Sequence, residues 1–210
     1  MLTQLTVREY TARLASGEPT PGGGSGAGLV AALGAALGEM VANFTVGKEK
    51  YRDAWEHVAP VLAQLTAHRD RLLDLTDRDA DAYAQVGAAY GMAKDTDEQK
   101  AARAEAIQEA LKAAASVPLG VCEEVAAALE LLPVLLLHGN PNLVSDVGVA
   151  AELGEAAFRC AWLNVEINFA SVKDEAYKAR TRKHLEDLMA LAENTAVAVW
   201  DETVRRVRGA

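Results

Sequence analysis

Apolar residues recur every three to four positions along almost the whole chain, which is the period of an amphipathic α-helix. No run of alternating β-branched residues bounded by turn signals is long enough to build a sheet. Helices are therefore expected at about residues 6–15, 25–46, 51–90, 97–115, 118–137, 145–170 and 172–208. The pattern predicts an all-α, single-domain bundle of about six to eight helices that covers residues 1–210.

Prolines and one turn sequence set the expected breaks between these helices. Pro60 is expected to kink the third helix or to split it in two. Pro118 is expected to begin the fifth helix, and Pro133 leaves the end of that helix undetermined. Gly139–Asn142 reads Gly-Asn-Pro-Asn, which predicts a turn.

Three consecutive glycines, Gly22, Gly23 and Gly24, form an unusual segment near the start of the chain. Glycine loses more conformational entropy on folding than any other residue, so such a loop is expected where bare main chain must approach another group closely. That group could be a ligand or a neighbouring helix. The segment lacks Gly-Lys-Ser/Thr and follows no strand, which argues against a nucleotide P-loop and a dinucleotide fingerprint.

The helix after the glycines is rich in small residues. Gly34 and Gly38 form a Gly-x-x-x-Gly motif, which also occurs where membrane helices pack. The uninterrupted apolar run is shorter than the roughly 20 residues that a membrane span needs, since Glu39 and Asn43 interrupt it. Close packing in a water-soluble core is the better interpretation, so no membrane role is expected.

The chain is acidic, with a formal net charge of -9 in 210 residues. Nucleic acid is therefore not an expected partner, because phosphate binding needs a basic face. Cys122 and Cys160 are far apart and are both expected to be buried small hydrophobes. The four histidines show no metal-ligand spacing, and the N-terminus lacks the pattern of a signal peptide. A cytoplasmic, metal-free protein is the expectation.

Asp79 differs from the three aspartates around it, because it falls on the apolar side of its predicted helix. That side also carries Leu72, Leu75, Ala82, Tyr83, Val86 and Tyr90. The other side carries Asp74, Asp77 and Asp81, which are expected to form a solvated face. A core-facing carboxylate is expensive to desolvate, so it should be paired or have a raised pKa. A general acid/base fits, and so does a structural carboxylate that caps a neighbouring helix or pairs with Lys or Arg.

Two polar pairs occur in the predicted helix 145–170. Ser145 and Asp146 lie at its start, where N-capping is the expected role, although free N–H groups there would also suit an anionic or carbonyl-bearing ligand. Asn164 and Asn168 are one turn apart on a side expected to face inward. Buried amides need partners, which are each other, the backbone or a ligand.

A short basic run follows the small-residue helix, at Lys48, Lys50 and Arg52. Such a run is usually a solvated helix end that interacts with the helix dipole. In an acidic protein it could also be the local positive patch that receives a multiply anionic substrate.

Several sequence blocks, taken in order, resemble the formiminotetrahydrofolate cyclodeaminase and methenyltetrahydrofolate cyclohydrolase family. They are Pro19–Ser25, Met40–Lys48, Asp79 with Ala82 and Tyr83, Ala115–Leu119, Gly139–Asn142 with Ser145 and Asp146, and Asn164–Asn168. The blocks extend over nearly the whole chain, and together they are far more specific than any one of them. After Tyr90 the chain has Met92-Ala93-Lys94 where the family commonly has Leu-Pro-Lys, which puts the local loop geometry in question.

The resemblance implies an all-helical homodimer that acts on a tetrahydrofolate derivative without a tightly bound cofactor or a metal. It places the catalytic aspartate at Asp79, the second Asp of an Asp-x-Asp pair followed by a small residue and an aromatic. Asp79 would be the general acid/base, and Lys48 would receive the glutamate tail. The residues that the resemblance implies for substrate binding are Gly22, Gly23, Gly24, Asn43, Lys48, Ser145, Asp146, Asn164 and Asn168.

Two reactions fit the resemblance. In the cyclohydrolase reaction, water opens the methenyl bridge to give formyltetrahydrofolate; in the cyclodeaminase reaction, a folate nitrogen attacks the formimino carbon and ammonia leaves. The cyclohydrolase is favoured, because the chain lacks a formiminotransferase domain and its blocks at residues 90–91 and 97–117 look more like stand-alone cyclohydrolases. A different class also stays open, namely a non-catalytic helical module that dimerises through its Gly-x-x-x-Gly helix.

Overall fold

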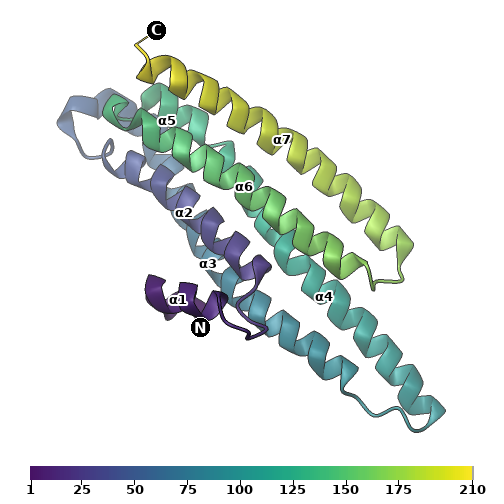
Figure 1. Cartoon of the computed structure of the whole chain (residues 1–210). Coiled ribbons are helices and arrows are strands. Elements are labelled where there is room, and N and C mark those ends of the chain that lie inside the picture. Colours follow the sequence, from purple (N-terminus) through teal and green to yellow (C-terminus); the bar gives the residue numbers. More distant parts are fainter. Residues whose placement is uncertain (210) are drawn as a thin grey trace.

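The computed structural model describes residues 1–209, and within that range it contains seven α-helices, three short 3-10 helices and no β-strand (Figure 1). The all-α prediction is therefore confirmed. The α-helices are α1 (Val7–Leu14), α2 (Gly23–Asn43), α3 (Trp55–Tyr90), α4 (Asp97–Leu129), α5 (Leu132–His138), α6 (Val144–Phe169) and α7 (Glu175–Val207). The 3-10 helices are η1 (Leu2–Gln4), η2 (Glu49–Ala54) and η3 (Pro141–Leu143).

The structure decides two of the predicted helix breaks. Pro60 lies inside α3, which continues from Trp55 to Tyr90, so of the two alternatives for Pro60 the split is wrong. Pro118 lies inside α4, so the predicted helices 97–115 and 118–137 are one helix as far as Leu129. Pro118 is buried in the core. Packing of its apolar ring stabilises the continuous helix, and this outweighs the backbone hydrogen bond that proline cannot donate. The actual break precedes α5, where Pro133 stands in the first turn.

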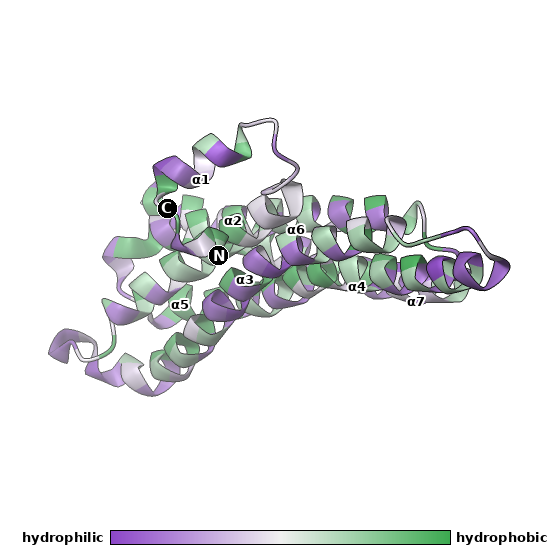
Figure 2. Ribbon diagram, turned by 90° about the horizontal axis from the view of Figure 1, so that it is seen from below, coloured by the Kyte–Doolittle hydropathy of each residue, from purple (hydrophilic) through white to green (hydrophobic). Residues whose placement is uncertain are grey.

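The long helices form two layers. The most extensive packing is between α2 and α3, α2 and α6, α4 and α6, and α3 and α4, while α7 flanks α6. The pair α2 and α6 thus rests on the pair α3 and α4, with apolar side chains between the layers. Figures 1 and 2 show that the end of the α3–α4 pair extends past the other helices and that hydrophilic residues gather on it.

Small residues allow α2 to lie very close to its neighbours. A Cβ atom on Gly34 would be 3.1 Å from the carbonyl oxygen of Ala150 on α6, and one on Gly38 would be 3.0 Å from Cδ1 of Leu65 on α3. Both glycines are buried within the chain. The Gly-x-x-x-Gly motif therefore packs inside one protomer, which corrects the alternative in which it forms a dimer.

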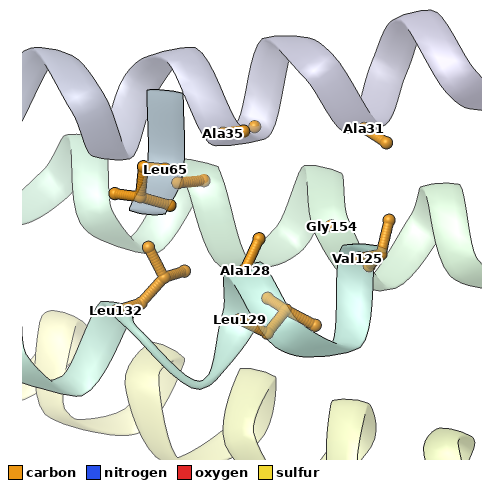
Figure 3. Close-up of a pocket in the computed structure, with 10 residues that line it drawn as sticks. Ala31, Ala35, Leu65, Val125, Ala128, Leu129, Leu132 and Gly154 are labelled. Carbon is orange, nitrogen blue, oxygen red and sulfur yellow. The ribbon is translucent and has the colours of Figure 1, made fainter. Parts of the chain in front are cut away.

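By length and composition, Gly23–Asn43 is the one helix in the described range that could cross a membrane. In the bundle it is a core helix, because it packs against α3 and α6 along its length. A void of about 10 Å³ remains between α2, α4 and α6, and Figure 3 shows its apolar lining of residues such as Ala31, Val125 and Leu129. It has room for at most one water molecule and offers no polar partner side chain, so it is a packing defect.

Two sequence predictions about single residues are wrong. Asp77 is half-buried and accepts hydrogen bonds from the amides of Leu2 and Thr3 and from Thr3 Oγ1, so it anchors the N-terminal segment to α3 instead of facing solvent. Cys160 is exposed, because it lies on the outward side of α6. Cys122 is buried as expected, and burial raises the pKa of its thiol.

Candidate functional site

Helix α2 begins without a side-chain cap of its own, and Asp79 on α3 supplies one. Its N-cap residue is Gly22, which has no side chain to accept a hydrogen bond from the first-turn N–H groups. Asp79 Oδ2 instead accepts from the amide of Ser25 and from Ser25 Oγ, both at 2.9 Å. The carboxylate is therefore paired with a neighbouring helix, which is one of the two roles that the sequence left open.

The three glycines differ in how closely other residues approach their main chain. Gly23 and Gly24 belong to the first turn of α2 and are not part of a loop. A Cβ atom on Gly24 would lie only 2.6 Å from Cγ of Asp79, so this position must be glycine for the carboxylate to reach Ser25. A Cβ atom on Gly23 would make an ordinary contact of 3.4 Å with Asn164 Nδ2. The close approach of bare main chain predicted from the sequence thus occurs at Gly24.

Asp79 stands in a pocket of about 330 Å³ beside the start of α2. The polar groups of the pocket come from Thr20, Asp79, Asn164, Asn168 and the main chain of the three glycines. The other lining residues are Pro19, Ala82, Tyr83, Val86, Ala114 and Ile167. An apolar pocket with a few convergent polar groups is the expected form of a small-molecule site. The structure therefore brings together six of the residues selected from the sequence: Gly22, Gly23, Gly24, Asp79, Asn164 and Asn168.

The two asparagines are held by their own helix. Asn164 Nδ2 donates to the carbonyl oxygen of Cys160 at 2.8 Å, and Asn168 Nδ2 donates to that of Asn164 at 2.8 Å. Within residues 1–209 neither side-chain oxygen receives a hydrogen bond. Both residues are half-buried and line the pocket, so they do not face the core as expected. Their oxygens are therefore acceptors that no donor in the described range uses.

The two tyrosines on the predicted apolar side of α3 are exposed. Tyr83 and Tyr90 are 57% and 46% exposed, and α3 extends past the start of α2 at the end that carries them (Figure 1). Ala82 and Val86 are half-buried and line the pocket. The apolar side is thus a pocket wall at this end of α3 and a core face only near Leu72 and Leu75.

The other four selected residues, Asn43, Lys48, Ser145 and Asp146, lie at the opposite end of the bundle. Asn43 ends α2 and Gly23 begins it, so the two are about 30 Å apart at 1.5 Å per residue. Ser145 and Asp146 lie in the first turn of α6, whose N-cap is Leu143, so neither is the predicted N-cap. Within one chain these four residues do not contact the pocket around Asp79.

A hydrogen-bonded network organises this second group. Thr45 is fully buried, its Oγ1 donates to the carbonyl oxygen of Val41, and it accepts from the amide of Asn140 at 2.9 Å. Tyr51 donates to Asn140 Oδ1 at 2.8 Å, and Trp55 Nε1 donates to the Thr45 carbonyl oxygen at 3.1 Å. These bonds join the end of α2 to the Gly-Asn-Pro-Asn turn. Asn43 and Lys48, on either side of Thr45 in the sequence, are exposed.

The sequence did not single out Ser25, whose side chain is completely buried and holds Asp79. Its position directly after the glycines was the available signal, because the third residue of a helix offers a free N–H group. Asp79 Oδ1 receives no hydrogen bond from any residue in the described range. One carboxylate oxygen is thus anchored by Ser25, and the other has no donor among the described residues. No group of three His, Cys, Asp or Glu side chains in residues 1–209 is placed to hold a metal ion.

The chain is similar to several known proteins. A family model described as formiminotransferase-cyclodeaminase matches residues 6–187. A methenyltetrahydrofolate cyclohydrolase of Methylorubrum extorquens is 42% identical over 187 residues, which are 89% of this chain and 90% of that protein. A formimidoyltransferase-cyclodeaminase of Sus scrofa is 36% identical over 200 residues, 95% of this chain but only 37% of that protein.

A solved structure is also similar. The crystal structure of formiminotetrahydrofolate cyclodeaminase from Thermotoga maritima superposes with a TM-score of 0.80 at 32% identity, over 100% of this chain and 98% of that one. The similarity therefore extends over the whole bundle, including both ends of α2.

Proposed function

The chain belongs to the formiminotransferase-cyclodeaminase family, and from that premise we propose that it is an enzyme of folate one-carbon metabolism, a methenyltetrahydrofolate cyclohydrolase. It would hydrolyse methenyltetrahydrofolate to formyltetrahydrofolate. Its similarity to the Methylorubrum extorquens cyclohydrolase over nearly the full length of both proteins supports this choice. The chain spans little more than a third of the longer Sus scrofa protein, so that protein's combined activities are not proposed for it.

The observation that supports catalysis most directly is the arrangement of the Asp79 carboxylate. Its Oδ2 is anchored by two hydrogen bonds from Ser25, its Oδ1 receives none from the described residues, and the side chain lines the pocket. A carboxylate held in a fixed position within reach of a ligand is suited to general acid/base chemistry. The methenyl bridge carries a positive charge, which a carboxylate in an otherwise uncharged pocket would attract.

The proposed reaction proceeds in two steps. A water oxygen forms a bond to the bridging carbon while Asp79 takes a proton from that water, which gives a neutral carbinolamine. The bond from this carbon to one ring nitrogen then breaks. Asp79 returns its proton to the leaving nitrogen, and the hydroxyl proton passes to solvent as the formyl C=O forms. The oxygens of Asn164 and Asn168 would accept hydrogen bonds from the pterin, which orients the bridge toward Asp79.

Formiminotetrahydrofolate cyclodeaminase is the second candidate, because the solved Thermotoga maritima structure with that name matches the whole chain. The same carboxylate would protonate ammonia as it leaves the tetrahedral intermediate. The two reactions share a one-carbon unit between two nitrogens, so the pocket suits both. The chemistry proposed for either reaction requires no tightly bound cofactor.

A homodimer is part of the proposal, and the outer face of α2 and α6 supports it. On α6 the outward residues Val149, Leu153, Ala156, Cys160, Leu163 and Ile167 are uncharged and follow the alternating spacing of four and three residues that is typical of helix–helix seams. Leu163 and Ile167 are 71% and 70% exposed, and Leu33 on the neighbouring α2 is 52% exposed. Such a continuous apolar face is costly in water, which supports an interface at this face.

A twofold dimer through this face would join the two groups of selected residues. Helices α2 and α6 run in opposite directions, so the Asp79 pocket lies at one end of the face and Asn43, Lys48, Ser145 and Asp146 lie at the other. If the twofold axis is perpendicular to these helices, each end faces the opposite end of the partner. The face measures about 30 by 20 Å, which would bury roughly 1,200 Å² in total and suffices for a specific interface. The partner's Lys48 would then receive the glutamate tail.

The test of the function uses the purified chain with methenyltetrahydrofolate and formiminotetrahydrofolate in separate assays. Loss of the methenyl chromophore is expected with the first substrate, and ammonia release would mark the second reaction. If neither substrate is turned over, the proposal is contradicted and a non-catalytic role is favoured.

A cytoplasmic location is proposed as well, supported by two cysteines that are not joined in a disulfide.

A further inference from the structure

Tyr83 lies in the wall of the pocket, and the exposed face of its ring has no structural partner. It is the one aromatic side chain among the described residues that line the pocket, and it is 57% exposed. Within residues 1–209 its hydroxyl group forms no hydrogen bond and its ring stacks on no other ring. The exposed face of the ring is therefore open to a ligand in the pocket.

Two other tyrosines differ from Tyr83 in this respect, because each lies against a cation of this chain. The ring centroid of Tyr90 is 5.7 Å from Cζ of Arg103, and that of Tyr51 is 5.1 Å from Nζ of Lys50. The face of an aromatic ring carries partial negative charge and attracts cations within about 6 Å. Tyr83 has no such cation in the described part of the chain, so the same attraction is left for a group of the ligand.

Asp79 strengthens the preference of this wall for positive charge. Tyr83 follows Asp79 by four residues in α3, so the two side chains lie on one face of the helix, with Cβ atoms roughly 6 Å apart. Both line the pocket, where Asp79 is the one charged side chain among the described residues. The oxygens of Asn164 and Asn168 add partial negative charge from α6, because no donor in those residues uses them. A planar group with a delocalised positive charge suits this arrangement best.

We propose that Tyr83 recognises the positive charge of the methenyl bridge through the face of its ring, and so selects the cationic substrate over the neutral formyl product. The inference rests on the proposed function, because the cationic bridge belongs to the substrate proposed there. The bridge shares its charge between two nitrogens and loses that charge when water adds to its carbon. The ring therefore favours binding of the substrate more than it speeds the chemical step.

The experiment measures equilibrium binding of methenyltetrahydrofolate and formyltetrahydrofolate to the full chain in the Asp79→Asn background, where turnover is expected to be too slow to interfere. Tyr83→Leu removes the ring and keeps an apolar side chain of similar reach. Its Kd for the methenyl form should rise at least about fivefold more than its Kd for the formyl form. In protein that keeps Asp79, the ratio of KM for the methenyl form to the inhibition constant of the formyl form should rise by the same factor.

Two further variants are matched controls. Tyr83→Phe retains the ring, so it should change each Kd by less than about twofold. Tyr90→Leu removes an exposed tyrosine of the same helix that does not line the pocket, and it should also leave both values within about twofold.

Three results would overturn the inference: a loss of affinity in Tyr83→Leu that is equal for both ligands, no loss for either ligand, or an equal loss in Tyr83→Phe, which would assign recognition to the hydroxyl group. Turnover of methenyltetrahydrofolate by Asp79→Asn tests the proposed function separately. If Asp79→Asn is inactive and Tyr83→Leu does not discriminate between the ligands, the role of Tyr83 fails and the proposed function stands. If Asp79→Asn has the parent kcat, the proposed function itself is wrong.

Discussion

The Asp79 carboxylate accepts hydrogen bonds from both the amide and the hydroxyl of Ser25, each at 2.9 Å, and so caps helix α2 from a different helix. The same side chain lines the pocket. One group therefore has a structural and a proposed catalytic role, and substitutions of Asp79 must be chosen so that the cap survives. Asparagine meets this condition, because its side-chain oxygen can accept both bonds.

The first prediction concerns Gly24. Gly24→Ala places a Cβ atom against the Asp79 carboxylate, so Asp79 must move away from Ser25. We expect a loss of about 1–3 kcal/mol in the free energy of unfolding and a fall in kcat/KM of roughly 100-fold or more. Chemical denaturation and steady-state kinetics measure the two effects.

Gly87→Ala is the matched control for this change. Gly87 is also in a helix, but a Cβ atom there would meet nothing within 4 Å. The control should be more stable by about 0.5–1 kcal/mol and should retain its kcat/KM. If Gly24→Ala keeps the parent kcat/KM, the contact between Gly24 and Asp79 is not needed for activity.

The sequence predicts the fold of this protein better than the details of its site. Helical periodicity separates Asp79 from its neighbours because it reports the direction of a side chain along one helix. It does not report contacts between distant segments, so it misses both the anchoring of Thr3 by Asp77 and the contact of Ser25 with Asp79. The helix break predicted at Pro118 is wrong for a related reason, because packing in the core outweighs the tendency of proline to end a helix.

The resemblance predicts which residues bind substrate, but it does not show that these residues lie at two opposite ends of the bundle. Asn43 and Lys48 are separated from Asp79 by the length of α2, which no linear motif expresses. The exposed apolar residues of α6 form a stripe, which supports a dimer that would bring the two groups together. This stripe can be recognised only once the structure shows which side of α6 faces outward.

The second prediction concerns the dimer. Leu163→Glu introduces a charge into the apolar face, on a side chain that is 71% exposed in the single chain. We expect the dimer to dissociate and activity to fall, while helix content is retained, because each pocket would lose the partner's residues. Light scattering after size-exclusion chromatography gives the mass. Val197→Glu, on the exposed face of α7, is the control that should remain dimeric and active.

Mixing two inactive variants checks whether the sites are shared. Asp79→Asn and Asp146→Ala homodimers should each lack activity, since each lacks one part of every site. Reassembly of an equal mixture makes half of the dimers mixed, and each mixed dimer has one intact site. About a quarter of the parent activity should return. Absence of any recovery, with mixed dimers verified by mass, would place both residues in independent roles.

The third prediction concerns Lys48, which is exposed and is proposed to receive the substrate's glutamate tail. Lys48→Ala should raise KM for a polyglutamylated substrate more than for the monoglutamate form, because each added carboxylate contributes to the attraction. Lys50→Ala is the matched control, since Lys50 lies over the ring of Tyr51. Equal changes in KM for both substrate forms would exclude a tail-binding role.

Proton transfer by Asp79 is tested most directly by the turnover rate of Asp79→Asn with methenyltetrahydrofolate. The amide can still accept from Ser25 but cannot take a proton from water, so the melting temperature should remain within a few degrees of the parent protein. The rate constant kcat should fall by at least about 100-fold. A folded Asp79→Asn variant that converts the substrate at the parent rate would contradict the account.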